Sequence, residues 1–340
     1  MDKLRLATVG CGYFSQFHHQ AWQRLDVDIV GICDLDMTKA RSFADEYGGD
    51  RAYDDFTAML SECQPDLVDI ILQPTQHLDH IKIACEHSVA VICQKPFTEN
   101  LAQAKQAVGI AADTGNILAI HENFRFQPWY RRIKELIDQN RLGQIYQIRF
   151  DLRPGDGQGA EAYLDRQPYF QQMKQFLIRE TGVHFIDVFR YLCGEPNAVW
   201  ADLRQLNPAI IGEDAGLFIL EFEHQQRAVF DGNRLSDHVA DNHRLTMGEM
   251  QIEGELATLE LNGRGQIAIR DKGSNMAKEI DLDWDDTGFG GDCVYLMQRH
   301  VLEHMQCGAP LENSGDEYLK NLTIQELVYR SNQEGRRLIV

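Results

Sequence analysis

The sequence has too few positive charges to suit a nucleic-acid-binding protein. Its 33 Lys and Arg residues are outnumbered by 52 Asp and Glu residues, which leaves a formal net charge of −19. Such a balance repels polyanions and anionic membrane surfaces. We therefore expect neither nucleic acid nor a membrane as a partner, and an anionic ligand would have to be held locally, for instance at a helix N-terminus.

Long apolar runs and paired cysteine motifs are also absent from the sequence. No apolar stretch approaches the roughly 20 residues that cross a bilayer, and the first residues show no secretory signal pattern. The eight cysteines include no C-x-x-C pair, which favours buried free thiols in a reducing compartment. His300 and His304 have the spacing of a helical metal-binding pair, but no third ligand accompanies them at a suitable spacing. We expect a cytoplasmic protein with no metal site.

The 340 residues are 44% hydrophobic and 25% charged, as in ordinary globular proteins, and the length suggests about two domains. Over the first third of the chain, short apolar runs alternate with amphipathic stretches. This alternation predicts a doubly wound parallel sheet, a Rossmann domain, over residues 1–122. The apolar runs lie at 4–9, 27–33, 66–72, 89–93 and 118–121, and the helical patterns lie at 15–25, 37–47, 54–63, 77–87 and 99–114.

A glycine motif stands between the first predicted strand and the first predicted helix. Gly10 permits a tight turn, and Gly12 lets a pyrophosphate approach the backbone at the positive end of the helix. Ser15 replaces the third glycine of the dinucleotide motif and is still small. Asp34 ends the second apolar run, where a carboxylate accepts hydrogen bonds from the adenosine ribose and repels a 2′-phosphate. We therefore expect NAD, rather than NADP, as the cofactor.

The pattern changes after residue 122. A predicted helix at 129–140 is followed by alternating runs, which predict a large, open, mostly antiparallel sheet of six or more strands. The chain is thus α/β followed by α+β, with a second domain over residues 123–340. Few helices accompany so many strands, so one sheet face lacks a cover within the chain, and we expect a homodimer or homotetramer. The predicted strands lie at 145–152, 199–206, 215–223, 227–232, 244–253, 256–261 and 266–270, and a last helix lies at 292–307.

A polar stripe marks a predicted helix at 180–192. Glu180, His184, Asp187 and Tyr191 recur at intervals of four, three and four residues, so they line one helical face. A carboxylate one turn before a histidine can receive its N–H, fix its tautomer and stabilise the imidazolium. The spacing alone also suits an ordinary solvated helix face.

The long connection 155–179 carries Tyr163, Arg166 and Tyr169 just before that helix. Connections of this length are usually functional or disordered, and we interpret this one as a cover that faces the substrate. Arg234 and His238 follow a predicted strand, and we expect them to reach the same pocket.

Several motifs spread over nearly the whole chain point to one family. They are Gly10-Cys11-Gly12 with His18, Pro74 with His77, Lys95-Pro96, Asn123-x-Arg125-Phe126-x-Pro128, Gly182-x-His184-x-x-Asp187 and Arg330-Ser331. Together they resemble the Gfo/Idh/MocA oxidoreductases, named after glucose–fructose oxidoreductase and inositol dehydrogenase. The resemblance implies a Rossmann domain followed by a domain whose large open sheet often packs against another subunit. One departure is Gln94, because the family usually has Glu-Lys-Pro where this chain has Gln-Lys-Pro.

The resemblance also implies roles for individual residues. A nicotinamide cofactor would carry the hydride, His184 oriented by Glu180 would take the hydroxyl proton, and Lys95 would stabilise the developing alkoxide. The expected cofactor-binding residues are Gly10, Cys11, Gly12, Tyr13, Phe14, Asp34, Pro74, His77, Gln94, Lys95 and Asn123. The expected substrate-binding residues are Lys95, Arg125, Tyr163, Arg166, Tyr169, His184, Asp187, Arg234 and His238.

These features predict an NAD-dependent oxidoreductase that acts on a secondary alcohol or ketone of a sugar, a polyol or a related small polyhydroxylated substrate. Two other functions stay open at the level of sequence. One is a glycosidase that uses NAD for a transient oxidation, and the other is a dinucleotide-binding regulator without catalysis. The joint presence of Lys95 and His184 argues against the regulator.

Overall fold

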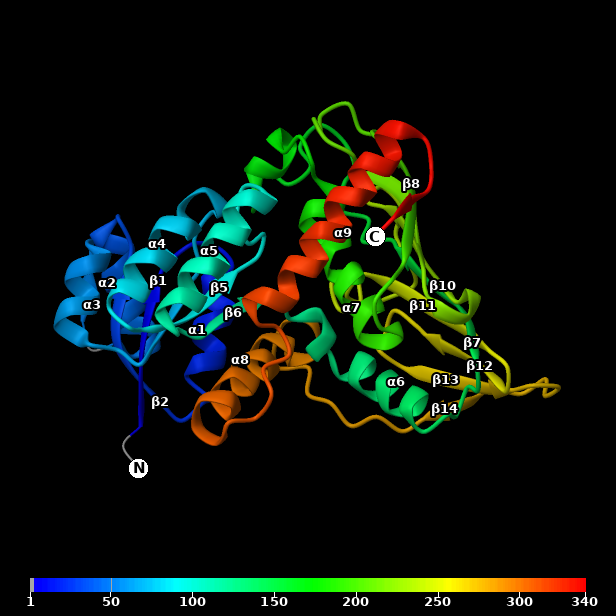
Figure 1. Cartoon of the computed structure of the whole chain (residues 1–340), viewed down its shortest axis with the longest axis horizontal. Helices are drawn as coiled ribbons and strands as arrows, with labels where there is room; N and C mark the ends of the chain where they lie inside the picture. Colours follow the sequence, from blue (N-terminus) through cyan, green and yellow to red (C-terminus); the bar gives the residue numbers. More distant parts are fainter. Residues whose placement is uncertain (1–2, 50) are drawn as a thin grey trace. The chain divides into compact units, whose positions relative to one another are not determined.

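The computed structural model describes residues 3–49 and 51–340, which form two compact units (Figure 1). The first unit comprises the residues up to Glu122 together with Val294–Lys320, and the second comprises Asn123–Cys293 with Asn321–Val340. The units change at residues 122 and 123, where the sequence pattern also changes. The predicted domains, 1–122 and 123–340, differ from these units because residues 294–320 belong to the first one.

Within the described residues of the first unit, six parallel strands lie in the order β3-β2-β1-β4-β5-β6. The order reverses between β1 and β4, and ligands of such sheets bind at the carboxyl ends of the strands at the reversal. The predicted Rossmann sheet is therefore confirmed. The strands are β1 (Leu4–Val9), β2 (Val27–Cys33), β3 (Ala52–Tyr53), β4 (Leu67–Ile70), β5 (Ala90–Gln94) and β6 (Leu118–His121).

Side-chain caps and glycines set the bounds of the helices in this unit. Asp36 and Asn100 begin α2 and α5, because their side chains accept hydrogen bonds from Thr38 N and Gln103 N. Gly48 ends α2 with φ at +82°, a conformation that a residue with a Cβ adopts only at a cost. The helices are α1 (Ser15–Trp22), α2 (Met37–Tyr47), α3 (Phe56–Cys63), α4 (Pro74–Glu86) and α5 (Leu101–Thr114).

Residues 294–320 cover the edge of the first sheet. After helix α8 (Phe289–Cys307), the backbone oxygen of Asn313 accepts a hydrogen bond from Ile120 N at 2.9 Å, and Asn313 Nδ2 donates to Ile120 O at 2.6 Å. Ser314 forms a β-bridge with Ala119 next to this pair. Because β6 is an edge strand, its unpaired backbone groups need such partners, which explains why a distant segment joins this unit.

Within the described residues of the second unit, nine strands lie in the order β14-β13-β12-β11-β7-β10-β9-β8-β15. The pair β7 and β10 is parallel and the other pairs are antiparallel, so the predicted open, mostly antiparallel sheet is confirmed. The strands are β7 (Ile145–Leu152), β8 (Ala198–Arg204), β9 (Ala215–Glu221), β10 (Arg227–Asn233), β11 (Gly248–Gly254), β12 (Ala257–Leu261), β13 (Ile267–Asp271), β14 (Lys278–Ile280) and β15 (Leu338–Ile339). The last two are too short to show alternation in the sequence.

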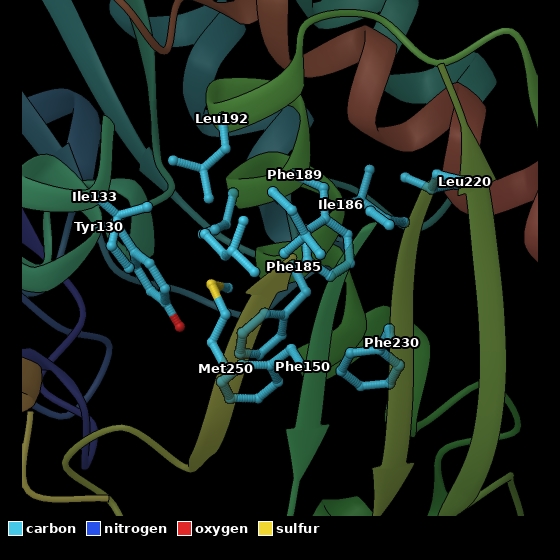
Figure 2. Close-up of a cluster of buried hydrophobic side chains, with 14 of the residues drawn as sticks. Tyr130, Ile133, Phe150, Phe185, Ile186, Phe189, Leu192, Leu220, Phe230 and Met250 are labelled. Atoms are coloured by element: carbon cyan, nitrogen blue, oxygen red, sulfur yellow. The ribbon is translucent and has the colours of Figure 1, made fainter. Parts of the chain in front are cut away.

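Helices bury one face of this sheet in an aromatic core (Figure 2). Phe150 of β7 stacks on Phe185 with ring centroids 3.8 Å apart, and Phe230 of β10 stacks on Phe218 of β9 at 4.8 Å. Burial of each such side chain contributes about 1.5–3 kcal/mol. The helices are α6 (Pro128–Asp138), α7 (Val183–Cys193) and, from Asn321 onward, α9 (Gly315–Glu334). The core therefore holds α7 firmly against the middle of the sheet.

His19 in α1 is a fully buried histidine that the fold keeps neutral. Its Nδ1 donates to Ser15 O at 2.9 Å, and its Nε2 accepts from the hydroxyl of Thr8 at 3.0 Å. Burial lowers the pKa of His19 from 6.5 to about 4. Between these two values the unfolded chain binds a proton that the folded chain excludes, so the free energy of unfolding must fall as the pH is lowered.

We expect His19→Gln to weaken this pH dependence. The shift corresponds to a loss of about 2 kcal/mol of wild-type stability between pH 7 and pH 5, and the Gln variant lacks the titrating group. Urea unfolding of both proteins at pH 7 and at pH 5 measures how much stability each one loses. The contributions of the other titrating groups cancel when the loss in the variant is subtracted from the loss in wild type. Equal losses in wild type and variant would contradict the assignment.

Candidate functional site

The glycine turn after β1 has the shape that a dinucleotide needs. Gly10 has φ of +103°, and a Cβ at this position would stand 2.3 Å from Ile71 O at the end of β4. Gly12 is exposed and no atom lies within 4 Å of where its Cβ would stand, so a phosphate can approach the backbone there. Ser15, at the third position, is buried, and its hydroxyl donates to Gly12 O at 2.5 Å. The small residue in place of glycine thus closes the turn.

The carboxylate of Asp34 is fixed against the same turn. Its Oδ2 accepts a hydrogen bond from Cys11 N at 2.8 Å, and its Oδ1 accepts one from Asp36 N at 2.9 Å. Each carboxylate oxygen can accept a second hydrogen bond, so Asp34, which is partly exposed, has lone pairs left for a ribose. The open space at Gly12 and this oriented carboxylate fit the pyrophosphate and the adenosine ribose of NAD.

The neighbouring residues of the turn have simpler roles. Burial, and next the nearby Asp34 carboxylate, raise the pKa of the Cys11 thiol to about 12, which suits a small spacer rather than a nucleophile. Tyr13 is 39% exposed, and Phe14 is partly buried. Both residues stand just before α1, which begins at Ser15.

His77 braces the first unit, although the sequence suggested a cofactor contact. Its Nδ1 lies 2.7 Å from Phe97 O and its Nε2 lies 3.0 Å from Leu72 O, and burial lowers its pKa to about 4. Pro74 stands at the first turn of the same helix, α4. His77 therefore lies between the residues after β4 and the segment that follows Lys95, and its one N–H donates to one of the two carbonyl oxygens.

In the second unit, the predicted helix 180–192 is wrong at its start. α7 begins at Val183, and residues Leu177–Gly182 form a π-helical turn that contains Glu180. His184 lies within α7, is 4% exposed, and stacks on Phe124 with ring centroids 3.8 Å apart and planes at 3°. π-Helical turns are often found at functional sites, because they present side chains that a regular helix would place elsewhere.

Glu180 and Tyr169 lie close enough to influence each other. Burial, and next the Glu180 carboxylate, raise the pKa of the Tyr169 hydroxyl, which also accepts a hydrogen bond from Gln167 Nε2 at 3.2 Å. Tyr169 is 39% exposed. The Tyr169 side chain is therefore partly exposed, and its hydroxyl lies near the π-helical turn.

Arg125 and Asp187 bind each other rather than pointing into open space. Arg125 Nε and Nη2 donate to the two oxygens of Asp187 at 2.7 and 2.6 Å, and Asn321 Nδ2 donates to Asp187 Oδ1 at 2.7 Å. Asp187 is 1% exposed. A buried, bidentate pair of this kind costs several kcal/mol to break from one side. The geometry thus favours a bracing role for both residues in place of the substrate contact that the sequence suggested.

Asp156 is the acceptor at the centre of a second polar cluster, and sequence reasoning did not select it. Arg234 donates to it at 2.8 and 3.1 Å, Arg166 at 2.6 Å and the Tyr163 hydroxyl at 3.0 Å. Burial by itself would raise the pKa of Asp156, but the two arginines hold it below its usual value. In the sequence, Asp156 stands between Gly155 and Gly157. Such a pattern is too common to indicate a functional residue.

This cluster anchors the connection 155–179 to the π-helical turn. Arg234 is 2% exposed, and its Nη1 donates to Thr181 Oγ1 at 2.8 Å, next to Glu180. His238 also acts as a brace, since its Nδ1 donates to Arg153 O at 2.7 Å. The connection is therefore anchored to the rest of the unit: Tyr169 stays exposed, while Tyr163, Arg166 and Arg234 hold the segment in place through Asp156.

The two halves of the chain match models of one protein family. Residues 4–122 match the oxidoreductase family with an NAD-binding Rossmann fold, and residues 130–260 match the C-terminal domain of the same family. The chain belongs to the Gfo/Idh/MocA oxidoreductases. The resemblance seen in the motifs is thus confirmed, and so is NAD as the cofactor of the fold.

Relatives that match the chain over its full length are dehydrogenases. The D-apiose dehydrogenase of Paraburkholderia graminis is 31% identical over 99% of this chain and 89% of its own, and that of Rhizobium rhizogenes is 27% identical over 99% and 97%. Among solved structures, an oxidoreductase from Agrobacterium radiobacter in complex with NAD⁺, L-tartaric acid and magnesium superimposes with a TM-score of 0.90, at 25% identity over 99% of this chain and 98% of its own.

No helix in residues 3–49 and 51–340 is both long and apolar enough to cross a membrane. Over the same residues, no group of three or more His, Cys, Asp or Glu side chains is arranged to hold a metal ion.

We expect wild-type protein to bind NAD more tightly than NADP, and Asp34→Ser to reduce that preference by about tenfold or more, because the carboxylate repels a 2′-phosphate. Equilibrium titration of both cofactors, followed by protein fluorescence, measures the ratio. Asp45→Asn, which removes an exposed carboxylate from α2, is the control and should leave the ratio unchanged. Lys39 and Arg41 follow Asp34 in the sequence and are the nearby cations that could bind a 2′-phosphate. Tighter binding of NADP by the wild type would contradict the prediction and point to these two residues.

Proposed function

We propose that this protein is an NAD-dependent dehydrogenase that oxidises a secondary alcohol of a small sugar, with an aldose such as D-apiose as the first substrate to test. The observation that carries the proposal is the match to two D-apiose dehydrogenases over 99% of the chain, which includes both units. The motif residues Lys95 and His184 are present in this chain. A polyhydroxylated substrate also suits Tyr169, which is 39% exposed and whose hydroxyl lies near Glu180.

NAD, when bound, supplies the acceptor for the hydride that leaves the substrate carbon. The residues proposed to hold it are those of the glycine turn, with Asp34 on the ribose. His184 takes the hydroxyl proton as general base, and Glu180 stabilises the resulting imidazolium. Stacking on Phe124 holds the ring of His184 in one plane, so that the imidazole needs little reorientation when the proton is transferred. The Lys95 ammonium donates a hydrogen bond to the alkoxide that develops.

The cover and its anchor define the proposed selectivity. Tyr169 is the residue of the cover that we assign to a substrate hydroxyl, because it is the exposed one of the two tyrosines selected from the sequence. Tyr163, Arg166 and Arg234 keep the cover in one conformation through Asp156. A preformed cover selects small substrates without first having to order a mobile loop.

We expect Lys95→Met and His184→Asn each to lower kcat by about 10²-fold or more, while the affinity for NAD stays within a few-fold. A screen of aldoses and polyols at 340 nm finds the substrate, and initial rates with titrated NAD separate the two effects. Lys82→Met, an exposed lysine of α4, is the control. A Lys95 or His184 variant that keeps a tenth of wild-type activity would remove that residue from the catalytic set.

The second sheet has a face that we propose to be an interface between subunits. Trp200, Ile219 and Val229 stand side by side on β8, β9 and β10, opposite the buried core face, and each is partly exposed in the single chain. Arg149 on β7 continues this row and pairs with Asp151 and Asp231. An apolar strip bordered by ion pairs is typical of the interface in a homo-oligomer.

We expect light scattering at micromolar concentration to find a homodimer or homotetramer. Ile219→Glu should dissociate it, because the variant places a charge in the middle of the apolar strip. Met276→Glu alters a side chain that is 71% exposed in the turn before β14 and serves as the control. A wild-type monomer would refute the proposed interface.

We also propose a location in a reducing compartment such as the cytoplasm. All eight cysteines are free, and most of them are buried. Thiols in this state suit a protein that never meets an oxidising environment.

A further inference from the structure

Beneath Lys95, three buried polar side chains from different elements of the first unit form a chain of hydrogen bonds. Asp69 is on β4, His18 is on α1 and Gln94 ends β5, and the exposed fractions of these residues are 0%, 0% and 6%. His18 Nδ1 lies 2.8 Å from Asp69 Oδ2, and His18 Nε2 lies 2.9 Å from Gln94 Nε2. Gln94 Oε1 accepts a hydrogen bond from Lys95 N at 2.5 Å. No motif in the sequence indicated a role for Asp69.

The backbone N–H of Lys95 has a fixed role in this row of hydrogen bonds, because it can only donate. That role determines which atoms of Gln94, His18 and Asp69 donate and which accept. A backbone N–H is always a donor, so the Gln94 atom that faces Lys95 N must be the amide oxygen. The amide nitrogen of Gln94 then faces His18, and because this nitrogen can only donate, His18 Nε2 must accept. His18 Nε2 therefore has no proton, the Nδ1 proton is donated to Asp69, and the imidazole is neutral. Rotation of the Gln94 amide would put two donors 2.5 Å apart at Lys95 N.

The surroundings of His18 agree with a negative charge located on Asp69. Trp22 Nε1 donates to the same Asp69 oxygen at 2.8 Å. Asp69 Oδ2 thus accepts hydrogen bonds from both His18 and Trp22, and two donors on one oxygen favour the carboxylate form of Asp69. From β6, His121 lies against the His18 ring with centroids 4.1 Å apart, and Phe14 approaches it at 5.7 Å. A second proton on His18 would thus place a positive charge against the His121 ring.

We propose that Asp69, His18 and Gln94 are a positioning relay for Lys95, in which the identity of residue 94 sets the charge of His18. Glutamine holds His18 neutral and keeps the negative charge on Asp69, away from Lys95. A glutamate at the same place would accept from Lys95 N and also from His18 Nε2, so His18 would have to bind a second proton. The role of the relay in catalysis rests on the proposed function of Lys95, whereas the charge of His18 does not.

The charge of His18 can be measured in the cofactor-free protein with ¹⁵N-labelled histidine and two-bond ¹H–¹⁵N correlation spectra. In wild type at pH 7 we expect the neutral form with the proton on Nδ1, and an imidazolium or a proton on Nε2 would overturn the proposal. In Gln94→Glu we expect the imidazolium at pH 7, and a neutral His18 in the folded variant would overturn it as well. His19, which bonds to Ser15 and Thr8 instead, is the internal control and should stay neutral in both proteins.

The positioning role has its own kinetic test. Gln94→Ala removes the acceptor for Lys95 N, so we expect kcat to fall by about tenfold or more, with partial rescue and a displaced pH–rate profile in Gln94→Glu. Wild-type kcat in Gln94→Ala, or an unmoved profile in Gln94→Glu, would overturn the positioning role. Wild-type protein that turns over no sugar would refute the proposed function instead, and the His18 spectra would still decide the charge of the relay.

Discussion

The close approach of β1 and β4 at their carboxyl ends is the constraint on which the chemistry of the first unit depends. Gly10 lies so near Ile71 that no Cβ fits between them. This contact sets where the turn after β1 runs, and therefore where Gly12 opens to solvent and where Cys11 N meets Asp34. A bulkier residue at position 10 would push apart the strands that flank the reversal of strand order, and the space for a pyrophosphate would be lost.

The same reversal explains why buried polar groups gather there. Asp69 on β4 and Gln94 on β5 end neighbouring parallel strands, and α1 returns across them with His18 and Trp22. Asp69 Oδ2 and the side-chain nitrogens of His18 have partners in this cluster, whereas Asp69 Oδ1 is buried with no hydrogen-bond partner among the described residues. An unsatisfied buried atom costs about 1–3 kcal/mol, so the hydrogen bonds at Oδ2 have to hold the carboxylate in place.

The second unit obtains its rigidity from buried ion pairs. Arg234 and Asp156 join the cover to the π-helical turn, and Arg125 and Asp187 join α7 to the residues after β6. Such pairs add little stability compared with apolar replacements, but breaking one from a single side costs about 3–5 kcal/mol. They are therefore better explained as devices that fix one conformation of the connection 155–179 and of α7.

The sequence by itself determined the Rossmann sheet, the antiparallel second sheet and the NAD-binding turn, because these depend on local periodicity and on glycines and acids a few residues apart. Tertiary structure alone determined which polar side chains pair with one another. Arg125, Asp187 and Arg234 have the residue types of a substrate site, yet their partners Asn321 and Asp156 lie far away in sequence. The extra residue of the π-helical turn at Glu180 and the return of residues 294–320 to the first sheet were equally hidden. Each of these outcomes depends on distant groups that satisfy one another's hydrogen bonds, and periodicity along the chain does not record such pairings.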